Sequence, residues 1–218
     1  MTDVQARTRA ARRVKIWHWK PPAGGWARHS VEINEETWYH IAGTFDSAGD
    51  VKSFYVTPAS GIFGPDTTST DSASEGILIT ADNQLGIGAT AVDLAKLQAG
   101  SIDDVQFYDH VLTEEQVGFL FGYPGLEAPE VPLAEGLLSH WAMEETTGPT
   151  LSNSAPESSG LDQTVVTSRV TVEPNGVVGS AVEITEAGDG YFRGYYWPLT
   201  DYSFSLWFNG MGNPSSND

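Results

Sequence analysis

Short apolar runs alternate with clusters of turn-forming residues along almost the whole chain. The runs are rich in Val, Ile, Phe, Tyr, Trp and Thr, and Gly, Asp, Ser and Pro separate them, a pattern typical of many short strands joined by turns. The strands that we expect lie at residues 14–20, 29–34, 38–45, 51–56, 76–79, 84–87, 100–108, 139–143, 165–172, 181–184, 191–195 and 203–209. The sequence therefore predicts an all-β fold.

One of these runs predicts a strand that is covered on both faces. In residues 203–209, Phe204, Leu206 and Phe208 alternate with polar residues and so share one face of a strand. The other face carries Trp207 among serines, which interrupts a clean polar face. We therefore expect an inner strand of a sandwich, buried on both sides.

A single segment has helical character. Thr113 and Gln116 are spaced as a capping box, in which the Thr hydroxyl and the Gln side chain satisfy each other's backbone amides. Val117, Leu120 and Phe121 then recur at spacings of three and four. These residues predict a short helix that begins after Thr113, ends at Gly122 and covers one edge of the sandwich.

The composition excludes several functions. The net charge is −18 over 218 residues, so the body of the protein repels nucleic acid and anionic membranes. No apolar run approaches the roughly 20 residues of a membrane helix, and there is no cysteine to form a disulfide. Residues 1–20 differ, with six basic residues against one acid, and we expect residues 1–13 to be a solvated, partly disordered leader.

A proline-rich stretch divides the chain. Residues 123–136 contain Pro124, Pro129 and Pro132 among polar residues, which is typical of a semi-rigid linker. We therefore expect two structural parts, residues 14–122 and residues 137–218.

The first part resembles the end of a known type of domain. The segment Glu36-Thr-Trp-Tyr-His-Ile-Ala-Gly-Thr-Phe-Asp46 is similar to the central strand of laminin-G-like jelly rolls, within the concanavalin A-like lectin/glucanase superfamily. Gly100-Ser-Ile-Asp-Asp-Val-Gln-Phe-Tyr108 and Leu112-Thr-Glu-Glu-Gln-Val117 resemble the last strand and closing helix of that family. The resemblance implies a jelly-roll β-sandwich of two antiparallel sheets.

The second part resembles the beginning of the same domain. Leu137-Leu-Ser-His-Trp-Ala-Met-Glu-Glu145 is similar to the family's opening strand, and Val178-Gly-Ser-Ala-Val-Glu-Ile184 and Asp201-Tyr-Ser-Phe-Ser-Leu-Trp207 resemble the strands that follow. The order in this chain is therefore end first and beginning second. Two architectures follow: a circularly permuted roll, or parts of two tandem modules. We favour parts that complete each other, within one chain or between neighbouring chains, because a half-roll leaves unpaired edges.

The resemblance also implies a metal site. In related sandwiches a calcium ion is held by an Asp at the start of the last strand and by groups from an early strand. Asp103 and Asp189 match these positions and are the predicted calcium ligands. The alternative for each is a turn or capping role, because a carboxylate accepts backbone amides equally well.

Aromatic residues supply a candidate ligand surface. Flat rings beside polar acceptors suit stacking on sugars, although aromatics in sandwiches often serve as core or edge packing. The candidates are Trp17, Trp19, Trp26, Tyr195, Tyr196 and Trp197, whereas we assign Trp38, Phe45, Trp141 and Trp207 to the core.

The function that the resemblance implies is glycan binding or adhesion by a non-catalytic, calcium-stabilised module of a secreted or cell-surface protein. One alternative is a structural repeat whose half-rolls join neighbouring copies into a polymer. A second is a fragment of a glycoside hydrolase or polysaccharide lyase. The Glu-x-Asp-x-x-Glu arrangement of many retaining hydrolases does not occur, and the adjacent pairs Glu35-Glu36 and Glu144-Glu145 would point to opposite strand faces. We therefore do not expect an enzyme.

Overall fold

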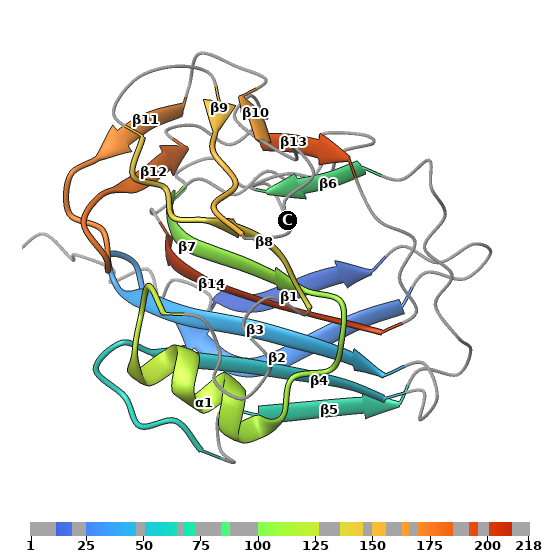
Figure 1. The fold of residues 1–218 in the computed structure, drawn as a ribbon. Coiled ribbons are helices and arrows are strands. Elements are labelled where there is room, and N and C mark those ends of the chain that lie inside the picture. Colours follow the sequence, from blue (N-terminus) through green and yellow to red (C-terminus); the bar gives the residue numbers. More distant parts are fainter. Residues whose placement is uncertain are drawn as a thin grey trace, which may run out of the picture.

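The computed structural model describes residues 12–18, 25–46, 51–64, 68–72, 84–87, 100–126, 136–145, 150–155, 163–165, 170–184, 192–195 and 201–210. Within these ranges every strand pairing is antiparallel. The all-β prediction is confirmed (Figure 1).

The described strands form one large sheet and two smaller ones (Figure 1). The large sheet runs in the order β11 (Val170–Glu173), β12 (Ala181–Ile184), β7 (Gly100–Tyr108), β14 (Tyr202–Gly210), β3 (Trp38–Asp46), β4 (Val51–Pro58) and β5 (Thr68–Ser72), and β8 (Leu137–Trp141) also pairs with β7. The second sheet contains β6 (Gln84–Ile87), β13 (Phe192–Tyr195), β10 (Gln163–Val165) and β9 (Thr150–Leu151). The third is a ribbon of β1 (Arg12–His18) and β2 (Gly25–Ile33).

Strand β14 lies in the middle of the large sheet. It pairs with β3 from Tyr202 to Asn209 on one side and with β7 on the other. Strands from residues 14–122 and from residues 137–218 thus form one continuous hydrogen-bonded sheet. This arrangement is expected if the two parts of the chain complete each other. That the arrangement arose by circular permutation stays a hypothesis.

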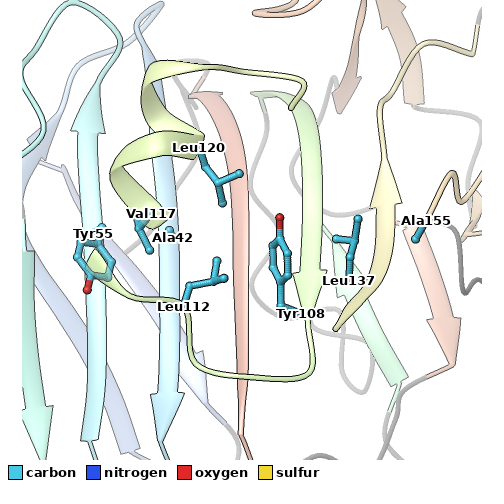
Figure 2. Packing of buried hydrophobic residues seen from close by; sticks show 8 residues of the cluster. All are labelled: Ala42, Tyr55, Tyr108, Leu112, Val117, Leu120, Leu137 and Ala155. Atoms are coloured by element: carbon cyan, nitrogen blue, oxygen red, sulfur yellow. The ribbon is translucent and has the colours of Figure 1, made fainter. Parts of the chain in front are cut away.

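One face of the large sheet is covered by helix α1 (Glu114–Gly122) (Figure 2). Thr113 Oγ1 accepts from the amide of Gln116 at 3.2 Å and Gln116 Oε1 from the amide of Thr113 at 2.8 Å, which confirms the capping box. The helix buries its apolar residues on one face of the sheet, in a cluster of Ala42, Tyr55, Tyr108, Leu112, Val117, Leu120, Leu137 and Ala155. The prediction that it covers an edge is therefore wrong, because its apolar side meets the face of β3 and β4.

The opposite face carries the rest of the core. One cluster gathers Ile102, Val105, Trp141, Met143, Leu151, Val182 and Ile184, and another gathers Tyr39, Ile41, Phe54 and Val56. Leu206 and Phe208 of β14 pack against both. Because Leu151 comes from β9 and Ile33 from β2, the two smaller sheets contribute to the layer that closes the sandwich.

Both faces of β14 are covered, as its mixed pattern predicts. Ser203, Ser205 and Trp207 are buried on the helix side. Phe45, Trp141 and Trp207 are confirmed as core residues, whereas Trp38 is only partly buried because it begins β3 at the rim of the sheet.

Several strand boundaries differ from the prediction. The run at 165–172 is not one strand, because residues 163–165 pair with β13 and β9 while residues 170–173 pair with β12 in the large sheet. Strand β8 ends at Trp141, since Met143 adopts a left-handed φ of 59°. The sequence did not predict strands β5 and β9. Strand β1 begins at Arg12, inside the predicted leader. The strand expected at residues 76–79 lies outside the described residues.

Candidate functional site

The buried acids Asp103 and Asp104 lie at a shift of register in the middle of β7. Ser205 of β14 pairs with Gln106, but Trp207 pairs with Asp103, so two residues of β7 stand opposite Leu206. One of them, Asp104, has a left-handed φ of 46°. On the other edge of β7, pairing with β12 ends at Ile102 and pairing with β8 begins at Val105. Asp103 and Asp104 therefore lie at the gap between two neighbouring strands.

Asp103 fastens the turn that precedes β12. Its Oδ2 accepts from the amides of Val177 at 2.7 Å and Val178 at 2.9 Å. The side chain is fully buried, and its Oδ1 has no hydrogen-bond partner among the described residues. Burial raises the pKa of Asp103 to about 6; the two amide bonds oppose this, and the neighbouring charge of Asp104 adds to it. The residue thus takes the capping role that we considered as the alternative to a metal ligand.

Asp104 joins its own strand, β7, to two other segments of the chain. Its Oδ1 lies 2.9 Å from His140 Nε2 in β8 and accepts from Gln106 Nε2 at 3.0 Å. Its Oδ2 accepts from the amide of Gly125, after the helix, at 2.7 Å. Burial opposes ionisation, but these bonds outweigh it and lower the pKa of Asp104. Two consecutive carboxylates therefore have pKa values shifted in opposite directions, each by the groups that it binds.

Two glutamates secure the segments on either side of this gap. The carboxylate of Glu144 accepts from the amide of Ser180 at 3.1 Å, next to Gly179, whose φ of 61° suits glycine. Glu145 Oε1 accepts from the amide of Ser152 at 2.6 Å. The acidic pair that follows β8 therefore anchors the turn before β12 and the residues after β9.

The described residues around Asp103 supply only part of a calcium site, because calcium takes six to eight oxygen ligands. Oδ2 faces two N–H donors, only Oδ1 is left as a ligand, and no group of three His, Cys, Asp or Glu side chains suited to a metal occurs in the described ranges. The second predicted ligand, Asp189, lies outside those ranges. The calcium site stays a prediction that depends on residues beyond the described ones.

The structure describes only some of the aromatic residues that we predict to bind a ligand. Trp17 in β1 and Trp26 in β2 are direct partners across the ribbon, and Tyr195 in β13 is the partner of Gln84 in β6. Trp19, Tyr196 and Trp197 lie outside the described residues. The ribbon brings two of the candidates together, and Tyr195 belongs to a different sheet.

Sequence reasoning missed the network around Asp104. In the sequence, Asp104 and Gln106 belong to the expected strand 100–108 and His140 to the expected strand 139–143, and nothing in their spacing indicates that they meet. One signal was present: Asp103 and Asp104 are consecutive acids inside the expected strand 100–108, and buried acids have to find hydrogen-bond donors.

These features define an antiparallel β-sandwich domain with a capped helix on the outer face of its main sheet. Residues 3–118 match the family model of the concanavalin A-like lectin/glucanases superfamily, which is more than half of the chain, and the chain belongs to this superfamily. Comparison with curated proteins and with solved structures found no match. Within the described ranges, α1 lacks the length and apolar character that a membrane span needs.

Proposed function

We propose that this domain is a non-catalytic carbohydrate-binding or adhesion module that acts outside the cell and recognises a glycan or surface glycoprotein. The superfamily name covers both lectins and glucanases, so membership alone admits either class. The choice between them rests on the aromatic candidates and on the use of the carboxylates.

The observation that carries the proposal is the pairing of Trp17 with Trp26. The two residues are direct partners in an antiparallel ribbon that is separate from the large sheet. Tryptophan offers a large flat surface with a polar N–H at its edge, which suits the faces and hydroxyl groups of a sugar ring. Two tryptophans that are direct cross-strand partners offer the neighbouring aromatic side chains that a shallow glycan site requires.

The environment of the acids supports a non-catalytic role. A retaining glycosidase needs two carboxylates about 5–5.5 Å apart, one of them free to donate a proton to substrate. Here Asp103 and Glu144 each accept from backbone amides, and Asp104 is buried against His140, Gln106 and Gly125. These carboxylates are used to hold the fold together.

A glycan array followed by titration calorimetry with the sugars that bind tests the proposal. We expect Trp17→Ala and Trp26→Ala each to weaken binding at least tenfold while the melting temperature changes little. The matched control is Tyr123→Ala, since Tyr123 is an exposed aromatic after the helix, and this variant should bind like the wild type. Unchanged binding in both Trp variants, or a blank array, contradicts the proposal; release of reducing ends from a polysaccharide favours the enzyme instead.

A further inference from the structure

Four buried polar side chains form a transverse row on the helix side of the large sheet. His40 in β3 is the cross-strand partner of Thr57 in β4 and of Trp207 in β14, and Trp207 is in turn the partner of Asp103 in β7. The row, which we call the polar row, therefore crosses four adjacent strands. Phe121 of α1 packs over its middle, with its ring centroid 5.9 Å from that of His40 and 5.8 Å from that of Trp207.

Each member of the polar row has one atom whose hydrogen bond is not made within the described part of the chain. These atoms are Thr57 Oγ1, His40 Nδ1, Trp207 Nε1 and Asp103 Oδ1. The four residues are between 0% and 3% exposed, so bulk water does not reach them. Most buried polar atoms in proteins have a partner, and four exceptions in one row need an explanation.

We propose that ordered water molecules bind along the polar row, beneath helix α1. Water suits the row because the four atoms differ in kind: Trp207 Nε1 only donates, Asp103 Oδ1 accepts when ionised, and a hydroxyl or a neutral imidazole nitrogen can serve in either role. A water bonded to two groups at about 2.8 Å each can join polar atoms that lie up to about 5.6 Å apart. A buried water usually makes two to four such bonds, which adjacent members of the row supply.

The state of His40 agrees with this arrangement. Burial lowers its pKa to about 4, against a smaller opposing effect of Asp104, so the ring is neutral at physiological pH. Its Nε2 lies 2.8 Å from Ser205 Oγ. Whichever tautomer that bond selects, Nδ1 is left with one hydrogen bond to make, as donor or as acceptor.

The first test detects the water directly, through the indole N–H of Trp207. In ¹⁵N-labelled protein, with the signal assigned by its loss in Trp207→Phe, we expect a cross-peak between this proton and a long-lived water. The internal control is Trp141, whose Nε1 is also buried without a partner in the described ranges but lies in the apolar cluster with Ile102 and Leu151. A signal at Trp207 and none at Trp141 supports the proposal, and no signal at Trp207 overturns it.

The second test uses the nearly isosteric change Thr57→Val. If a water bonds to the hydroxyl, its removal loses that bond, and we expect the melting temperature to fall by about 2–4 °C. If the hydroxyl has no partner, the same change removes a buried unsatisfied group and the melting temperature rises, which overturns the proposal. Val56→Thr, at a fully buried position on the apolar face of the same strand, calibrates the cost of an unpartnered hydroxyl.

Discussion

His40 Nε2 and Ser205 Oγ lie 2.8 Å apart across β3 and β14, although 165 residues separate them in the sequence. Both side chains are buried. The bond therefore joins the part of the chain that resembles the end of a jelly roll to the part that resembles its beginning. Because neither group reaches bulk water, loss of one leaves the other unpaired in the core.

We expect Ser205→Ala to lower the free energy of unfolding by about 1–3 kcal/mol, the range for leaving a buried polar group without its partner. Urea denaturation measures this change. Ser60→Ala, in the exposed turn after β4, is the matched control and should stay within about 0.5 kcal/mol of the wild type. Equal stability of the two variants would show that the bond contributes nothing.

The two titratable members of the polar row have opposite effects on stability. Folding raises the pKa of Asp103 from 3.8 to about 6, so between these values the folded state holds a proton that the unfolded state has released. Its contribution to stability therefore falls as the pH rises from 4 to 6. Folding lowers the pKa of His40 from 6.5 to about 4, so its contribution rises over nearly the same range.

Single variants should separate these two contributions. In Asp103→Asn the side-chain oxygen still accepts from the amides of Val177 and Val178, and we expect stability to rise more steeply with pH between 4 and 6 than in the wild type. His40→Gln should change the slope in the opposite direction. Urea midpoints at pH 4, 5, 6 and 7 measure both slopes. Parallel curves for all three proteins would rule out both assignments.

The parts of the fold that follow from local chemistry could be predicted from the sequence. Strands 100–108 and 181–184 match β7 and β12, and the capping box at Thr113 places the start of α1, because alternation and capping act over a few residues. The division at residues 165–170 could not be predicted, since it depends on which distant strands pair with each end. The same limit applies to the site: Asp103 was identified, but its amide donors come from a turn more than seventy residues away.

Asp104 should be the most sensitive of the acids. Its replacement by Ala leaves the His140 ring, the Gln106 amide and the Gly125 N–H without their shared acceptor. We expect a loss of about 3–5 kcal/mol, the range for removing one partner of a buried charged network. Thermal unfolding measures the loss, and amide exchange at Gly125 locates it. Asp109→Ala, at the exposed position directly after β7, should cost less than about 0.5 kcal/mol; a similarly small effect of Asp104→Ala would contradict the network.

The position of β14 argues against strand exchange between copies at the centre of the large sheet. This strand already pairs on both edges within its own chain, with β3 and with β7, so the large sheet does not need a strand from a neighbouring copy at that place. We expect light scattering to give a mass near 23.5 kDa at all concentrations up to the millimolar range. A mass that grows with concentration would favour the alternative in which neighbouring copies polymerise.

The predicted calcium site at Asp103 and Asp189 has a test that does not require the sugar. An ion that binds only the folded state raises the melting temperature by an amount that grows with its concentration. If Asp103 Oδ1 and Asp189 are ligands, calcium raises the melting temperature relative to chelator, and Asp189→Ala abolishes that rise while leaving the amide bonds of Asp103 intact. Asp109→Ala should respond to calcium like the wild type. Identical melting curves of the wild type in calcium and in chelator would rule out the calcium site. Asp103 would then serve only to accept the amides of the turn before β12.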